Sequence, residues 1–306
     1  MNFPELLNAY GAPPLEITGD LSRLPQFSPL TPGAQALDDA APRSLDTLVM
    51  LAPPGTIERR AALALALRAL KEDACLVALA PKDKGGSRLA GDLESLGCTF
   101  EESSKRHHRI CITRDKGHPD KIAQAIADGA PRFDEELGLW TQPGVFSWNR
   151  IDPGSALLVA HLPDLSGRGL DLGSGLGVLS HAVLRSPKVS ALTLVELDAR
   201  ALACSRRNVS DGRAHFLQAD ARRLTDANLK ALDFVVMNPP FHDGGAEDKS
   251  LGQSFIKTAA GALRKGGALY AVANRHLPYE NVLKEHFRRV NLVAEEAGFK
   301  LFEAIA

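Results

Sequence analysis

The sequence predicts an α/β protein whose larger part is a doubly wound, mostly parallel β-sheet closed by an antiparallel hairpin. Short apolar runs alternate with helix-favouring segments along the chain, which is typical of parallel strands connected by helices. The alternation is regular from residue 168 onward. The last apolar region, 290–304, contains Gly298 near its middle, which favours a hairpin over another crossover. A shorter alternation between 45 and 114 predicts a second, smaller α/β domain.

The N-terminal part is expected to consist of an irregular arm and this small domain. Residues 1–44 are rich in Pro and Gly and predict an arm without regular structure. The next segments alternate between strand and helix and predict a parallel sheet covered on both faces. The expected elements are strands at 45–52, 74–80 and 109–114 and helices at 57–72 and 86–97. The segment "SSKRHHR" (103–109) is expected to connect the second helix to the third strand.

The C-terminal part, 131–306, is expected to form one larger domain. Asp152, followed by Pro153, marks the start of a helix over 152–162. The remaining segments predict strands at 168–172, 190–197, 213–218, 232–238 and 267–273, and helices at 176–185, 199–209, 250–264 and 278–289.

Length and composition limit the classes of protein that the chain can belong to. A chain of 306 residues predicts two domains, and a formal net charge of −1 gives no global attraction to nucleic acid or anionic membranes. The first residues, "MNFPELLNAYGAPP", lack the features of a signal peptide, and no apolar run is long enough to span a membrane. We therefore expect a cytoplasmic protein without membrane contact. The 4 cysteines have no CxxC spacing, so no metal site is expected.

A glycine-rich turn, "LDLGSGLGVLSHAVL" (170–184), joins a predicted strand to a predicted helix. Gly173, Gly175 and Gly177 allow the backbone to turn tightly and to approach a ligand closely. The spacing is GxGxG, and Val178 stands where the dinucleotide fingerprint GxGxxG has its third glycine. The loop also lacks the GK[ST] of a P-loop. The alternative is a plain tight turn without a ligand.

Three acids at the ends of successive predicted strands narrow the choice of ligand. Asp171, just before the glycines, would repel pyrophosphate but suits an ammonium or sulfonium group. Glu196 follows the glycines by about 20 residues, where related sheets place a carboxylate against a ribose diol. Asp220 could accept from an adenine amino group. The alternatives are a solvated acid for Glu196 and a helix N-cap for Asp220. Adenine, ribose and a cationic amino-acid part together describe S-adenosylmethionine.

The run "LDFVVMNPPFHDG" (232–244) ends a predicted strand at Asn238, because the two prolines that follow cannot continue the sheet. The side-chain carbonyl of Asn238 and the main-chain carbonyl of Pro239 can accept both hydrogens of a planar NH₂ group. Pro240 keeps the backbone rigid, and Phe241 can stack on a base. These contacts favour methyl transfer to that nitrogen through positioning and electrostatics. The alternative is a simple turn, which Asn-Pro also signals.

These motifs resemble the class I S-adenosylmethionine-dependent methyltransferases, and specifically the bacterial ribosomal RNA small subunit methyltransferase C family. The resemblance covers residues 140–306, and it rests on five segments. They are "PGVFS" (143–147), "DPGSALLVAHL" (152–162), "LDLGSGLGVLS" (170–180), "VMNPPFHDG" (236–244) and "ANRHLPYENVLKEHF" (273–287).

The resemblance implies a Rossmann-like class I methyltransferase fold with a seven-stranded sheet and N2-methylation of a guanine in 16S rRNA. The partner would be 16S rRNA or the small ribosomal subunit, and the cofactor S-adenosylmethionine. It implies that cofactor is bound by Asp171, Gly173, Ser174, Gly175, Gly177, Glu196, Asp220 and Asn238. It implies that catalysis uses Asn238, Pro239, Pro240 and Phe241. Substrate binding would use Phe146, Phe241 and His242, and Ser147 would lie in the same loop as Phe146.

Members of this family carry two methyltransferase-like domains, of which the first has lost its cofactor site. The run "LDTLVMLAPPG" (45–55) echoes 232–244 but lacks the asparagine and the phenylalanine. No glycine loop precedes it. We therefore expect 45–130 to be a degenerate, truncated methyltransferase-like domain and 131–306 to be the catalytic one.

Two other functions are compatible with part of the sequence. Methylation of a protein glutamine at N5 poses the same chemical problem, but Phe241 in place of tyrosine and the "PGVFS" segment favour a base. A non-catalytic ribosome-binding or assembly factor would not need the intact Asn238 and glycine loop. For RNA contact, "SSKRHHR" is the best basic candidate. Arg222–Arg223, Arg264–Lys265 and Arg288–Arg289 are interpreted as solvated surface charges.

Overall fold

The structure of the chain is a computed structural model, which describes residues 4–224, 226, 229–240, 242–243, 246–247 and 249–306. The chain divides into two compact units. Unit 1 comprises Met1–Pro131 with Gln142–Gly144, and unit 2 comprises Arg132–Thr141 with Val145–Ala306. No helix in the described part of the chain has both the length and the apolar character that a membrane crossing requires.

Unit 1 is built on a mixed five-stranded sheet in the order β1-β2-β3-β5-β4. Its strands are β1 (Asn8–Tyr10), β2 (Leu48–Leu51), β3 (Leu76–Pro81), β4 (Phe100–Lys105) and β5 (His108–Thr113). Strands β1, β2 and β3 run parallel, whereas β5 is antiparallel to both β3 and β4. The prediction of an all-parallel sheet was therefore wrong for this unit. Strand β4 has the mostly polar sequence FEESSK of an exposed edge, so it lacks the apolar alternation that would have identified it.

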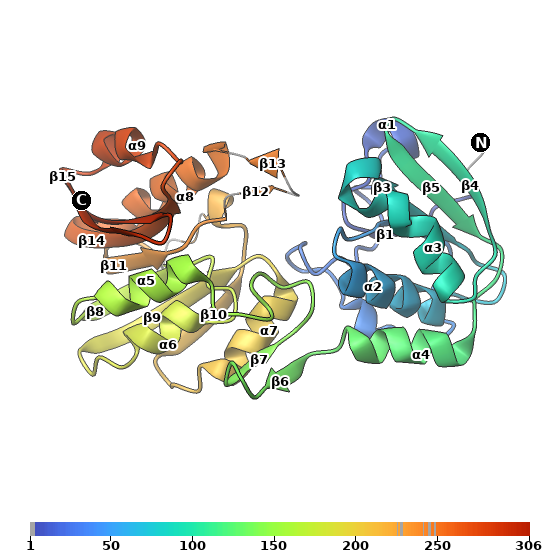
Figure 1. Ribbon diagram of the computed structural model, residues 1–306, viewed down its shortest axis with the longest axis horizontal. Coiled ribbons are helices and arrows are strands. Elements are labelled where there is room, and N and C mark those ends of the chain that lie inside the picture. Colours follow the sequence, from blue (N-terminus) through green and yellow to red (C-terminus); the bar gives the residue numbers. More distant parts are fainter. Residues whose placement is uncertain (1–3, 225, 227–228, 241, 244–245, 248) are drawn as a thin grey trace. The chain divides into compact units, whose positions relative to one another are not determined.

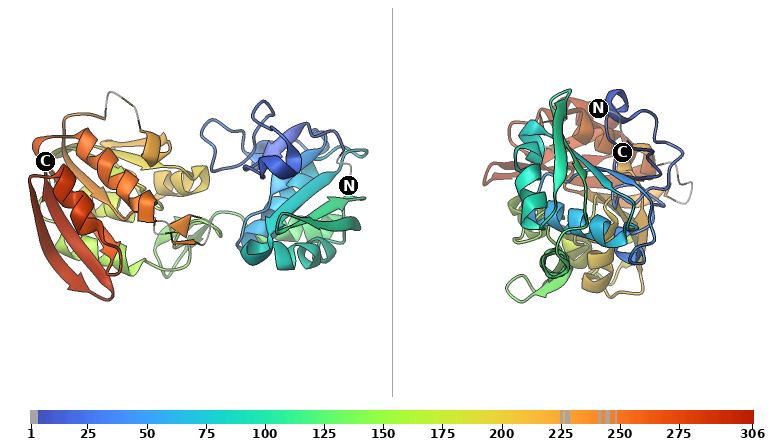
Figure 2. Two further views of the ribbon diagram at one scale, coloured as in Figure 1. Left: turned by 90° about the horizontal axis from the view of Figure 1, so that it is seen from above. Right: turned by 90° about the vertical axis from the view of Figure 1, so that its right-hand side faces the viewer.

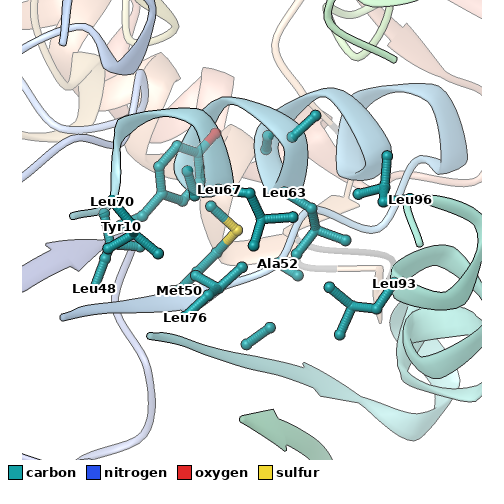
Figure 3. Packing of buried hydrophobic residues seen from close by; sticks show 14 of the residues in the cluster. Tyr10, Leu48, Met50, Ala52, Leu63, Leu67, Leu70, Leu76, Leu93 and Leu96 are labelled. Atoms are coloured by element: carbon teal, nitrogen blue, oxygen red, sulfur yellow. The ribbon is translucent and has the colours of Figure 1, made fainter. Parts of the chain in front are cut away.

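The segment 4–44 is more ordered than the irregular arm expected from its composition. Strand β1 is fully buried and pairs in parallel with β2. Figure 3 shows Tyr10 packed beside Leu48, Met50 and Leu67 in the core of this unit. A three-residue strand is too short to show periodicity, which is why its proline-rich surroundings dominated the prediction. The segment also contains α1 (Leu15–Thr18) and the 3₁₀ turn η1 (Leu37–Asp39).

The helices of unit 1 enclose a buried ion pair between Arg59 and Asp92. They are α2 (Thr56–Ala69), α3 (Ser87–Ser95) and α4 (Pro119–Asp128), with the irregular turn η2 (Lys82–Gly86) before α3. Arg59 of α2 is 0% exposed, and its Nε donates to Oδ2 of Asp92 over 2.6 Å. Its Nη1 donates to the main-chain carbonyls of Pro53 and Pro54 over 3.2 and 2.7 Å. These two prolines belong to the run "LDTLVMLAPPG", the sequence echo of 232–244.

Unit 2 contains a seven-stranded sheet in the order β10-β9-β8-β11-β14-β16-β15, with the β15–β16 hairpin at one edge (Figure 2). The strands are β8 (Gly167–Leu172), β9 (Val189–Glu196), β10 (Ala214–Gln218), β11 (Leu232–Met237), β14 (Leu263–Asn274), β15 (Arg289–Glu296) and β16 (Phe299–Ile305). All pairs are parallel except those of β16 with β14 and with β15. The predicted fold class, a parallel sheet ending in an antiparallel hairpin, is confirmed.

Helices cover both faces of the sheet of unit 2. They are α5 (Pro153–His161), α6 (Val178–Val183), α7 (Ala199–Asn208), α8 (Lys249–Ala262) and α9 (Tyr279–His286). Helices α5 and α6 lie on one face of the sheet, and α8 and α9 lie on the other (Figure 1). Phe234 and Val236 of β11 pack with residues of α5 and α6, whereas Val235 and Met237 pack with residues of α8 and α9. A strand buried on both faces explains the continuous apolar run before Asn238. The short ladders β6 (Arg132–Asp134) with β7 (Leu139–Thr141) and β12 (His242–Asp243) with β13 (Ala246–Glu247), and the turn η3 (Ala221–Arg223), complete the unit.

The two sheets share one topology. The order β1-β2-β3-β5-β4 of unit 1 repeats β8-β11-β14-β16-β15 of unit 2, with the same parallel and antiparallel pairs. Within the described residues, unit 1 has no counterpart of β9 or β10. Glu196 ends β9 and Asp220 follows β10, so the strands that unit 1 lacks are those that position these two acids.

Candidate active site

The predicted acids and Asn238 lie at one edge of the sheet of unit 2. Asp171 pairs with Val236 of β11, and Glu196 pairs with Gln218 of β10, each near the carboxyl end of its strand. In open α/β sheets, ligands bind outside this edge. Four residues that are far apart in the sequence are therefore placed along one rim, as the sequence predicts.

The glycine loop turns through left-handed backbone conformations that explain its composition. Gly173, Gly175 and Gly177 have φ of +81°, +52° and +85°. A Cβ at Gly177 would lie 2.8 Å from the side chain of Val209, whereas a Cβ at Gly175 would meet nothing within 4 Å. Gly177 is thus required by packing, and Gly175 leaves open space above the loop.

Asp171 is a buried carboxylate with one unpartnered oxygen. It is 0% exposed, and Oδ2 accepts a 2.6 Å hydrogen bond from the hydroxyl of Ser180. Oδ1 is also buried and has no partner among the described residues. Burial raises the pKa of Asp171 to about 7, and the nearby charge of Glu196 adds to the increase, while the Ser180 hydrogen bond opposes it. A cation beside Asp171 would relieve this cost.

Glu196 is tied to the glycine loop. Its Oε2 accepts from the backbone N–H of Gly175 over 2.8 Å, and its Oε1 accepts from the backbone N–H of Asp198 over 2.9 Å. Burial raises the pKa of Glu196, although these two hydrogen bonds act in the opposite direction. Each carboxylate oxygen keeps a further lone pair, so the predicted contact with a ribose diol stays a prediction.

Asp220 has the N-cap role that the sequence left open as the alternative to adenine binding. It is the N-cap of η3: Oδ1 accepts from the backbone N–H of Arg222 over 2.9 Å, and Oδ2 forms a 2.8 Å ion pair with the Arg222 side chain. The hydrogen bond with Arg222 lowers the pKa of Asp220. The contact with an adenine amino group stays a prediction.

The side chain of Asn238 is held in one orientation. Its Nδ2 donates to Oδ2 of Asp152 over 2.7 Å and to Oγ of Ser155 over 2.8 Å. Its Oδ1 is buried and has no partner among the described residues. A carboxylate can only accept, so the amide nitrogen must face Asp152 and the carbonyl must point the other way. The sequence marked Asp152 as the start of α5 but gave no sign that this helix begins beside the end of β11.

A surface pocket joins these elements. It is lined by Asn238, by Asp152 and Ser155, by the glycine loop at 173–176, and by Phe146 with Arg150. Of the predicted site residues, the pocket therefore brings together Phe146, Gly173, Ser174, Gly175 and Asn238. Asp171 and Glu196 are not among the residues that line the pocket. Pro239 is buried and Pro240 is exposed.

Phe146 stands in a loop that is fixed on both sides. Its neighbour Val145 is buried, while Phe146 itself is 59% exposed. Ser147 has φ of +56°, uncommon for a residue with a side chain. Its hydroxyl donates to the carbonyl of Arg150 over 2.8 Å. An exposed aromatic ring on a fixed loop beside the pocket is suited to stacking on a planar ligand.

Of the predicted substrate residues Phe241 and His242, the structure describes only the second, and only its backbone. Phe241 lies outside the described residues. For His242 the structure gives the backbone, which pairs with Glu247 in the β12–β13 ladder. Among the described residues, no cluster of three or more His, Cys, Asp or Glu could hold a metal ion.

The segment "SSKRHHR" forms the tip of the β4–β5 hairpin in unit 1, rather than a link between a helix and a strand. Arg106 and His107 occupy the turn with φ of +49° and +59°, and both are exposed. Arg109 forms an ion pair with Glu102, so part of the positive charge of the segment is neutralised by a neighbouring acid. Contact with RNA stays a prediction for this tip.

The fold and the geometry of this site define a class I methyltransferase. A family model described as "Methyltransferase small domain" matches residues 136–303. Ribosomal RNA small subunit methyltransferase C of Shewanella pealeana is 31% identical over 268 residues, covering 85% of this chain and 77% of that protein. The protein of the same name from Pseudomonas paraeruginosa is 34% identical over 281 residues, covering 89% and 83%.

A solved structure agrees with these sequence matches. The T. thermophilus 16S rRNA N2 G1207 methyltransferase (RsmC), in complex with AdoMet and guanosine, has a TM-score of 0.76 and 25% identity, covering 100% of this chain and 89% of that one. The chain therefore belongs to the ribosomal RNA small subunit methyltransferase C family.

Proposed function

We propose that this chain transfers a methyl group from S-adenosylmethionine to the exocyclic N2 amino group of a guanine in 16S rRNA. The observation that carries the proposal is the buried carbonyl oxygen of Asn238, which has no partner among the described residues and belongs to a side chain that lines the glycine-loop pocket. The T. thermophilus relative, which binds AdoMet and guanosine and acts on N2 of a 16S rRNA guanine, supports the choice of cofactor and substrate.

The residues present fit S-adenosylmethionine. The buried Oδ1 of Asp171 has no partner among the residues that the structure describes, and a nearby cation would stabilise the ionised carboxylate. Gly173, Ser174 and Gly175 line the pocket, and Gly175 leaves open space above the loop. In our proposal Asp171, Ser174 and the glycines at 173, 175 and 177 hold the methionine part, Glu196 the ribose and Asp220 the adenine. When bound, the cofactor supplies an electrophilic methyl group.

Asn238 and Pro239 would prepare the nitrogen that receives the methyl. The lone pair of an aryl NH₂ group is delocalised into the ring, so the group is a poor nucleophile. Oδ1 of Asn238 and the carbonyl of Pro239 would accept its two hydrogens, favour pyramidal geometry and stabilise the positive charge that develops on nitrogen. No strong general base is required, because the alkylated nitrogen is acidic and releases its proton to solvent.

Aromatic side chains would bind the base beside the pocket. Phe146 is exposed beside the pocket, and base–aromatic stacking contributes about 1–3 kcal/mol. We assign Phe241 and His242 to the same base-binding region from their places in the sequence motif. Pro240 would keep the turn after β11 rigid.

We propose that the partner is 16S rRNA, free or within the small ribosomal subunit, and that the protein acts in the cytoplasm, where this RNA is found. Unit 1, which contains the predicted domain 45–130, would be a methyltransferase-like domain without a cofactor site. Its shared topology with unit 2 and its lack of counterparts of β9 and β10 support this assignment.

The experiment that tests the proposal uses ribosomal material from a strain that lacks the enzyme. Free 16S rRNA, 30S subunits, tRNA and a release factor are each incubated with the protein and labelled S-adenosylmethionine, and products are mapped by mass spectrometry. Methyl transfer to N2 of one 16S guanine is expected. Modification of the release-factor glutamine alone would replace the proposal with protein methylation. Absence of cofactor binding in calorimetry would leave a non-catalytic role.

A further inference from the structure

Asp152 and Ser155 contact the reacting end of Asn238 from a different element. Both belong to the N-terminus of α5, which precedes the sheet of unit 2 in sequence, whereas Asn238 follows β11. We propose that Asp152 and Ser155 are positioning residues that lock the Asn238 amide with its carbonyl directed at the substrate. This inference rests on the proposed function.

The hydrogen-bond chemistry permits only one orientation of the amide. A side-chain amide has nearly the same shape when its oxygen and nitrogen exchange places, so packing alone does not select between the two. Here both N–H groups of Nδ2 have acceptors, at 2.7 Å on Asp152 and 2.8 Å on Ser155. The reversed amide would place a carbonyl oxygen against the Asp152 carboxylate and would lose a charge-assisted hydrogen bond. It would also turn the amide nitrogen toward the substrate's own N–H groups.

The same oxygen of Asp152 also anchors the helix. Oδ2 accepts from the backbone N–H of Ser155 over 2.8 Å, which makes Asp152 the N-cap of α5. Ser155 is only 8% exposed. The amide of Asn238 is therefore bound to a fixed helix end rather than to a mobile surface side chain.

The charge on Asp152 has a second consequence for Asn238. A carboxylate that accepts from the amide N–H polarises the amide and increases the electron density on Oδ1, since hydrogen bonds in a chain strengthen one another. Oδ1 then becomes a stronger acceptor as positive charge grows on the substrate nitrogen. Loss of Asp152 should consequently lower kcat more than it raises KM.

The test compares D152N, D152A and S155A, with D211N and S186A as matched controls. Asp211 is a carboxylate that caps its own turn with Arg213, and Ser186 is a buried hydroxyl that donates to Leu165, both in unit 2 but outside the pocket lining. We expect kcat to fall about 10- to 100-fold in D152A and less in S155A and D152N. The Kd for S-adenosylmethionine should stay within about twofold, and the controls should retain wild-type kcat.

A second measurement does not depend on activity. In protein labelled with ¹⁵N-asparagine, the side-chain NH₂ signal of Asn238, assigned by its loss in N238A, should be protected from exchange in the wild type. It should lose this protection in D152A but not in D211N. Wild-type kcat in both D152A and S155A, or an NH₂ signal that D152A leaves unchanged, would overturn the proposal. If the wild type methylates a substrate other than 16S rRNA, the proposed function is wrong. The same variants, assayed on that other substrate, then still test whether Asp152 and Ser155 position Asn238.

Discussion

Ser180 donates a 2.6 Å hydrogen bond from its hydroxyl to Oδ2 of the fully buried Asp171, whose Oδ1 has no partner among the described residues. Burial therefore dominates and raises the pKa of Asp171 to about 7. In the unfolded chain its pKa is about 4. Between these values the folded protein binds more protons than the unfolded chain, so the free energy of unfolding should decrease as pH rises from about 4 to about 7.

Urea unfolding of the cofactor-free protein at pH 5 and pH 7 checks this expectation. The decrease in stability across this range should be smaller in D171N than in the wild type. D211N is the control, because hydrogen bonds from Arg213 lower the pKa of Asp211 to about 2, below the tested range. An equal pH dependence in wild type and D171N would show that Asp171 does not titrate here.

Cofactor binding should respond to pH in the opposite sense. A cation beside Asp171 stabilises its ionised form, so binding should release a proton near pH 6–7 and affinity should increase with pH toward about 7. Calorimetry in two buffers with different ionisation enthalpies measures the proton release. D171N should bind more weakly and without this release. Proton release that persists in D171N would assign it to another group.

The Arg59–Asp92 pair in unit 1 should contribute strongly to stability. R59A would leave the carboxylate of Asp92 buried without its enclosed partner and the carbonyls of Pro53 and Pro54 without their donor. We expect a loss of about 3–5 kcal/mol in the free energy of unfolding of unit 1. R60A is the matched control, since Arg60 contacts the same Asp92 from a side chain that is 46% exposed, and its loss should be at most about 1 kcal/mol. Equal losses in both variants would contradict this account.

Phe146 should act in binding rather than in chemistry. F146A should raise KM for the RNA by about 5- to 100-fold, which corresponds to one lost stacking contact, and change kcat little. Phe133, also exposed in unit 2 at 44% but absent from the pocket lining, supplies the control variant F133A. Steady-state kinetics with the wild-type RNA substrate separate the two constants. A fall in kcat at unchanged KM would assign Phe146 to another role.

Much of the fold of unit 2 could be predicted because its signals are local. The apolar run of β11, the glycine turn after β8 and Gly298 in the final hairpin each identify an element from neighbouring residues. Strands β1 and β4 were missed because one is three residues long and the other is a polar edge. Contacts such as that of Asp152 with Asn238 join positions 86 residues apart, and only the assembled sheet determines them.

The most direct test of the account is the activity of N238A on 16S rRNA. The variant should bind S-adenosylmethionine with a Kd within about threefold of the wild type, and its kcat for guanine N2 methylation should fall at least about 100-fold, because an acceptor for the developing charge is lost. N291A, which changes an amide that contacts Glu303 outside the pocket, should retain full activity. If N238A methylates 16S rRNA at the wild-type rate, the central role assigned to the Asn238 carbonyl is wrong.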